Sequence, residues 1–145
     1  TQGVSSAASD VYKRQILTNC RIYATIYNIT RIPDFMQKTK EVRFAVSENG
    51  KCHIKEWLLG LDAQTRAWIH VRLVRLQYGA YGDYKLIDNK ISELRFFFSK
   101  GYRIYFTEKD NKLILLLNGG DKLSQDKDIK QAKLIFETLK RFGEV

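Results

Sequence analysis

The chain has 145 residues, and its 25 Lys and Arg against 16 Asp and Glu give a formal charge of +9. A hydrophobic fraction of 44% with a single proline excludes a low-complexity or collagen-like chain. The longest uninterrupted apolar run, Leu113–Leu117, is far shorter than the ~20 residues that cross a bilayer, so we expect no membrane partner.

Cysteine content and charge indicate the location of the protein and the class of its partner. Two cysteines are too few for a disulfide scaffold, which favours a reducing, cytoplasmic location. The positive excess favours a polyanionic partner, because Lys and Arg neutralise phosphates and release their counterions. Nucleic acid is therefore the first partner to test.

The sequence pattern of residues 1–35 differs from that of the rest of the chain. The single methionine is Met36, and a clean strand pattern follows it closely, whereas Val4–Gln15 resembles translated adapter sequence. We therefore expect residues 1–35 to be an adventitious or translated upstream segment without structure, and residues 36–145 to form the domain. The basic character belongs to that domain, because its 21 Lys and Arg against 14 Asp and Glu still give 21 − 14 = +7.

The spacing of apolar residues from position 36 onward predicts an α+β domain. In chain order we expect a strand at 41–46, a helix at 54–61, a second helix from Asp62 as N-cap to a stop at Gly79, strands at 91–98, 102–107 and 112–118, and a helix at 125–142. Short turns between the last three strands predict an antiparallel meander. The β-α-α-β-β-β-α order predicts a small twisted antiparallel sheet with two N-terminal helices and one C-terminal helix.

Two arginines and a tyrosine are expected on one face of this sheet. Residues two apart in a strand share a face, so Arg95 lies opposite the apolar face of its own strand, as do Arg103 and Tyr105 in the next strand. If the apolar faces pack on the two-helix layer, these three side chains occupy the more open face.

The third strand of the meander ends in a glycine pair. Gly119 and Gly120 lack side chains and would let the backbone approach a ligand closely, and Lys122 follows directly. Three cations, Arg95, Arg103 and Lys122, are therefore expected near one edge of the sheet, provided that acids of the same chain do not bury them in ion pairs.

Such a cluster suits RNA cleavage by the substrate's own 2′-OH. That reaction needs a base, positive charge on the transition state and an acid for the leaving oxygen. Arginine supplies bidentate phosphate contacts, and a lysine crowded by cations exchanges protons nearer neutrality. The residues themselves equally fit a solvated basic surface or a phosphate-binding patch without catalysis. We expect no metal or other cofactor in either case.

Several closely spaced motifs occur in the same order as in a known family. They are Ser92–Arg95, Gly101–Phe106, Leu115–Lys122 and Gln125–Ile129, preceded by Gly50–Lys51, Glu56–Leu58 and Tyr81–Lys85. Together they resemble the phage-derived, HigB-like killer-protein branch of the RelE/ParE toxin superfamily over residues 36–145. The resemblance implies a RelE-like fold and the toxin of a type II toxin–antitoxin addiction module.

The resemblance also implies an activity and partners. It implies an mRNA interferase, which is a ribosome-dependent endoribonuclease that inhibits translation without a metal, and a helix-turn-helix antitoxin as the partner that members of this branch have. Arg103 matches the arginine that contacts the scissile phosphate, whereas Arg95 and Lys122 lie near the family's proposed base and acid. Which residue is base and which is acid stays open. Lys85, Lys100 and Tyr105 are candidate RNA contacts, with Tyr105 stacking on a base.

Two other functions fit the same scaffold. A ParE-like protein would inhibit DNA gyrase without hydrolysis, and an inactive relic would retain antitoxin binding alone. Fold does not decide among them.

Overall fold

The computed structural model describes residues 38–145, and the expectation for residues 1–35 lies outside them. Its elements are β1 (Glu41–Phe44), α2 (His53–Leu59), α3 (Ala63–Leu76), β2 (Tyr84–Leu86), β3 (Ile91–Arg95), β4 (Arg103–Lys109), β5 (Leu113–Gly120) and α4 (Gln125–Arg141). The predicted α+β class is confirmed, because Thr39–Val145 forms a compact unit of one sheet and helices. No helix among the described residues is long and apolar enough to cross a membrane.

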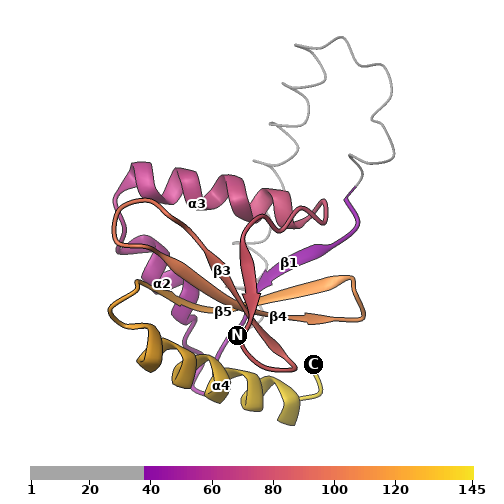
Figure 1. Ribbon diagram of the computed structural model, residues 1–145. Helices are drawn as coiled ribbons and strands as arrows, with labels where there is room; N and C mark the ends of the chain where they lie inside the picture. The colour runs from indigo at the N-terminus through magenta and orange to yellow at the C-terminus, as the bar shows by residue number, and fades with distance from the viewer. Residues whose placement is uncertain (1–37) are drawn as a thin grey trace, which may run out of the picture. The chain divides into compact units, whose positions relative to one another are not determined.

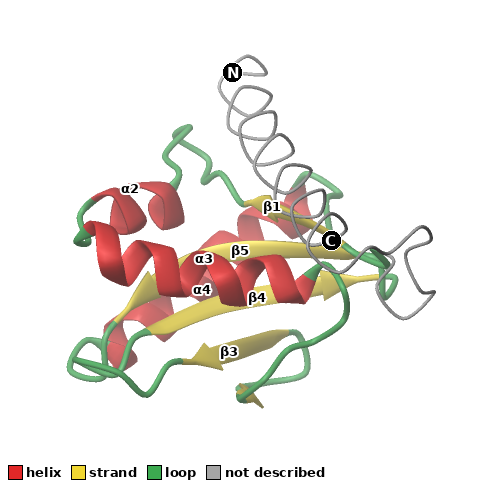
Figure 2. Cartoon of the chain, turned by 90° about the horizontal axis from the view of Figure 1, so that it is seen from above, coloured by secondary structure: helices red, strands yellow, loops and turns green. Residues whose placement is uncertain are grey.

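The sheet is mixed, which corrects the expected antiparallel sheet. Its strand order is β1-β5-β4-β3-β2, seen for β1, β5, β4 and β3 in Figure 2. β2 to β5 pair antiparallel, whereas β1 runs parallel to β5. Period-two alternation indicates a strand but carries no information on its direction or partner. β2 falls within the expected loop 79–89, and its three residues are all exposed, so it lacks the alternation that identifies a strand.

Helices cover both faces of the sheet, with α2 and α3 on one side and α4 on the other (Figure 1). The apolar faces of β3 and β4 pack on α2 and α3 as predicted, through residues such as Leu94, Phe96, Ile104 and Phe106. β5 lies between β1 and β4, and its residues Leu113–Leu117 contribute to both cores, which confirms the expected central strand.

Local signals place the ends of the long helix α3. The Asp62 carboxylate accepts a hydrogen bond from the Thr65 backbone N–H at 3.0 Å, as an N-cap does. The hydrogen bonds from Thr65 lower the pKa of Asp62. Gly79 follows the helix with φ of 76°, a conformation in which glycine is not strained. The predicted start of this helix is confirmed, whereas the helix ends at Leu76 with Gln77 as C-cap, slightly before the expected stop at Gly79.

Candidate functional site

Two arginines lie side by side at one end of the sheet. Arg95 is the direct cross-strand partner of Arg103, and Arg103 in turn pairs with Gly120 of β5. Paired residues of neighbouring strands share a face, and Tyr105, two residues from Arg103 on the same face, packs against α4, so this row lies on the α4 side of the sheet. Three strand ends thus meet at the point where β5 leads into Lys122.

Two lysines join the arginines at the turn between β3 and β4. The Lys122 backbone N–H donates to the Lys100 carbonyl at 3.4 Å. A Cβ placed on Gly101 would lie 3.7 Å from both Arg103 Nη1 and Lys122 Cβ. Arg103 Nη1 also donates to the Gly101 carbonyl at 3.0 Å. Arg95, Lys100, Arg103 and Lys122 therefore gather at one place, which we call the cationic end.

Both arginines of the cationic end have carboxylate partners. Arg95 Nη2 lies 2.9 Å from Asp83 Oδ1, and this hydrogen bond raises the pKa of Arg95. Arg103 Nε lies 3.3 Å from Glu93 Oε1, and the two side chains are 15% and 1% exposed. Gln125 Nε2 donates to the other oxygen of Glu93 at 2.9 Å. The arginines are thus partly neutralised, while Lys100 and Lys122 are exposed.

An arginine of α3 holds the strand that carries Arg95. Arg72 Nη1 donates to the Arg95 carbonyl at 2.7 Å, and Nη2 donates to the carbonyls of Tyr81 and Asp83 at 2.8 and 3.1 Å. The guanidinium also lies 4.7 Å from the Phe96 ring centroid. Burial lowers the pKa of Arg72. Sequence reasoning missed this residue, because its partners are backbone groups that leave no pattern in the sequence.

Tyr105 is not available to stack on a base, contrary to the sequence prediction. Its side chain is 0% exposed, and it packs in the core between the sheet and α4. Burial, with the charge of the neighbouring Glu93, raises the pKa of Tyr105. The alternation was assigned correctly, but α4 covers this face, so the face is not open at Tyr105.

The glycine pair accommodates the protein's own side chains, which corrects its expected role beside a ligand. A Cβ on Gly119 would lie 2.3 Å from the Trp57 ring, and a Cβ on Gly120 would overlap the Asp128 carboxylate. Gly119 and Gly120 face opposite sides of the sheet because successive residues of a strand alternate between its two faces. Burial raises the pKa of Asp128, whose carboxylate accepts a hydrogen bond from Ser124.

Lys85 lies on the edge strand β2 beside this site. It is exposed and pairs directly with Glu93, so its row of the sheet adjoins the row of Arg95 and Arg103. The structure therefore places Lys85 within the same face of the sheet as the two arginines, although its lysine side chain has no described contact with them.

Phe97 is an exposed aromatic residue at the cationic end that the prediction of RNA contacts did not include. Its side chain is 81% exposed, and the Arg95 guanidinium lies 5.8 Å from its ring centroid. The signal was present in the sequence, because period two places Phe97 on the Arg95 face while Phe96 and Phe98 pack against α3.

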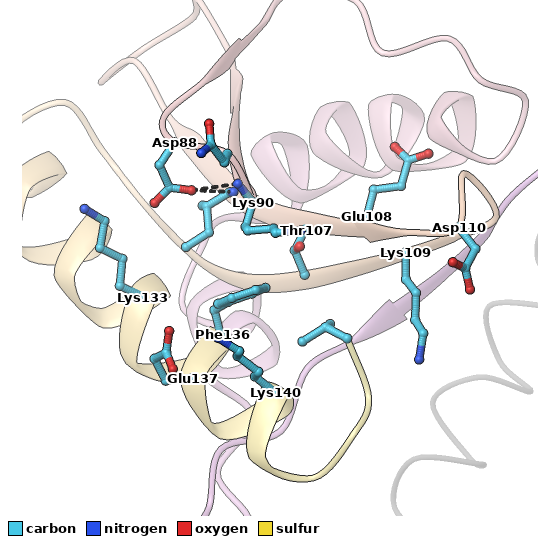
Figure 3. A pocket seen from close by; sticks show the side chains of 13 residues that line it. Asp88, Lys90, Thr107, Glu108, Lys109, Asp110, Lys133, Phe136, Glu137 and Lys140 are labelled. Atoms are coloured by element: carbon cyan, nitrogen blue, oxygen red, sulfur yellow. Dashed lines mark hydrogen bonds between the residues drawn. The ribbon is translucent and has the colours of Figure 1, made fainter.

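A separate pocket of about 640 Å³ lies at the opposite end of β4, beside the C-terminal half of α4 (Figure 3). The cations predicted for the site do not line it. Its Asp88 carboxylate accepts hydrogen bonds from the backbone N–H groups of Lys90 and Ile91, and its Glu108 carboxylate pairs with Lys40. Both carboxylates bind groups of the protein itself and therefore stabilise its fold. Among residues 38–145, no three His, Cys, Asp or Glu side chains form a metal-ligand group.

Fold and site together define an α+β protein whose sheet presents a cluster of cations at one end. No protein-family model matches the chain. It is similar to a Haemophilus influenzae protein described as an uncharacterized protein, with 46% identity over 84 residues that cover 57% of this chain and 85% of that protein. The chain therefore belongs to the same family as this Haemophilus influenzae protein.

Proposed function

We propose that the chain is the toxin of a type II toxin–antitoxin module, with a RelE-like fold, and that it cleaves mRNA on the ribosome at its cationic end. The observation that carries this proposal is the convergence of Arg95, Arg103 and Lys122 from three strand ends. The charge of +9 and the motif resemblance support it. A helix-turn-helix antitoxin in the same cytoplasm silences the toxin.

The proposed reaction is attack of the substrate 2′-OH on the adjacent phosphorus. The O2′–P bond forms and the P–O5′ bond breaks, which leaves a 2′,3′-cyclic phosphate and a 5′-OH. A base takes the 2′-OH proton, and an acid returns a proton to O5′. Arg103 and Arg95 stabilise the charge that develops on the phosphate oxygens, because a guanidinium stays protonated and is unsuited to act as base. Lys122 is exposed and carries protons to exchange at the leaving oxygen.

The ion pairs favour a second candidate, which is RNA or partner binding without cleavage. Arg103 faces the buried Glu93, and Arg95 faces Asp83, so each arginine offers a phosphate less charge than a free guanidinium. A ParE-like gyrase inhibitor and an antitoxin-binding relic belong to this second candidate.

Primer extension on cellular mRNAs after induction distinguishes the two candidates. Lys122→Ala changes an exposed side chain, and Arg103→Lys retains a cation for Glu93 while losing the planar fork. Arg103→Ala is less suitable, because it leaves the buried Glu93 without its cation. The matched control is Lys130→Ala, which removes an exposed lysine from the outer face of α4.

Under the first candidate, wild type and Lys130→Ala produce discrete cuts and growth arrest. Arg103→Lys lowers the cleavage rate by roughly 10²–10³-fold, as removal of one transition-state donor does. Growth arrest without cuts supports the second candidate. Unchanged cutting by both site variants, at unchanged melting temperature, refutes the site assignment.

A further inference from the structure

Phe97 is held in a defined position despite its exposure. Its neighbours Phe96 and Phe98 pack into the core on the α3 side, and Phe98 contacts the Trp68 ring edge-on at 4.9 Å. The Phe96 backbone N–H donates to the Tyr102 carbonyl at 2.9 Å, which closes the hairpin between β3 and β4. Core anchors on both sides therefore fix the backbone that presents the Phe97 ring to solvent.

The turn itself is also constrained. Ser99 and Gly101 both have positive φ, at 53° and 68°, and the Gly101 N–H donates to the Phe98 carbonyl at 3.2 Å. The next segment closes on this turn through the bond from the Lys122 N–H to the Lys100 carbonyl. A ring on such a turn loses little conformational freedom when a flat ligand covers it.

The surroundings of Phe97 suit an anionic ligand with an aromatic part. Arg95 lies against the ring, and its position is set by Asp83 on one side and by the bond from Arg72 to its carbonyl on the other. Lys100 is exposed on the same turn, and Lys122 is exposed on the segment after β5 that closes on this turn. A nucleotide combines a negatively charged phosphate with a planar base, and proteins that bind single strands pair a basic groove with aromatic platforms.

We propose that Phe97 is a stacking platform for one base of a single-stranded RNA whose backbone lies along Arg95, Lys100 and Lys122. This inference rests on the proposed function for the identity of the nucleic acid. The Phe97 ring stacks on the base, and the cations hold the adjoining phosphates. Stacking on a phenyl ring accepts every base, so Phe97 contributes affinity and position and leaves sequence choice to other contacts.

Fluorescence anisotropy with a short single-stranded oligoribonucleotide at low salt tests this inference. A second probe has the same backbone but abasic sites in place of the bases. Variants are Phe97→Ala, Phe97→Leu, which keeps an apolar side chain without a π face, and Phe97→Trp, which keeps the platform. Phe142→Ala is the matched control, because Phe142 is 64% exposed at the far end of α4.

We expect Phe97→Ala and Phe97→Leu to weaken binding of the base-bearing probe by roughly tenfold to a hundredfold, and Phe97→Trp and Phe142→Ala to leave it near wild type. The abasic probe should bind wild type and Phe97→Ala equally. Equal losses on both probes, or full binding by Phe97→Leu, overturn base stacking. Absence of wild-type binding to the oligoribonucleotide overturns it as well.

The outcomes for the two proposals are separable. If Phe97 governs binding of the base-bearing probe but induction produces no mRNA cuts, the stacking platform stands and the cleavage proposal fails. If cuts occur and depend on Arg103 while Phe97→Ala binds both probes like wild type, cleavage stands and the platform fails. Loss of affinity for a protein partner alone, with RNA binding unchanged, also overturns the platform.

Discussion

Replacing Gly119 by alanine should destabilise the fold through a single contact. The new Cβ would lie 2.3 Å from Trp57 Cε3, whereas carbon atoms in contact are ordinarily ~3.5–4.0 Å apart, so the ring must move by more than about 1 Å. The Trp57 ring cannot turn aside freely, because it packs edge-on against Tyr102 at 6.0 Å. Overpacking of this kind costs about 1–3 kcal/mol.

Urea denaturation and thermal melting measure this effect. A loss of about 1–3 kcal/mol corresponds to a fall in melting temperature of roughly 4–12 °C for a chain of this size. The control is Gly60→Ala, since a Cβ there meets its nearest atom, the Trp57 carbonyl oxygen, at 3.4 Å with an ordinary helical φ of −77°. That variant should lie within about 1 kcal/mol of wild type.

A double-mutant cycle tests whether contact with the Trp57 ring causes the loss of stability. In a Trp57→Ala background the added methyl group meets no ring, so Gly119→Ala should cost much less there. An undiminished cost in that background, or wild-type stability of Gly119→Ala alone, would refute the reasoning. Wild-type stability together with loss of the proposed mRNA cleavage would instead support the ligand-facing role that the sequence predicted for Gly119.

Three further predictions concern the supports of the site and the pH dependence of folding. Arg72→Lys should lower the free energy of unfolding by about 1–3 kcal/mol in urea titrations, because an ammonium cannot span three backbone carbonyls. Glu93→Ala should cost about 2–4 kcal/mol by the same measurement, somewhat below a fully buried pair because Arg103 keeps some exposure, and adding Arg103→Met should recover most of the loss. Burial lowers the pKa of His70 below its ordinary 6.5, so the unfolded chain binds more protons there and stability falls as the pH drops through 6.5. His70→Gln should lose less stability than wild type between about pH 7 and pH 5.5, and equal losses would contradict this assignment.

Local pattern alone was sufficient for the elements other than β2 and for the faces of the strands. Period two separates Phe96 from Arg95 and Phe97 wherever the strand is placed, because side chains alternate irrespective of the neighbouring strand. The N-cap at Asp62 is equally local, since its hydrogen bonds reach Thr65, three residues away. The functional proposal depends on these local facts together with the motif resemblance.

The tertiary structure determines which elements pack against those faces. Nothing near Tyr105 in the sequence indicates that α4 will cover it, and the direction of β1 follows from its pairing with β5, which is distant along the chain. The ion pair of Arg103 with Glu93 likewise joins two neighbouring strands, so its formation depends on their register. Alternation is a property of one strand, whereas burial and charge pairing are properties of two or more elements in contact; the cationic end was therefore foreseeable from the sequence, but its neutralising partners were not.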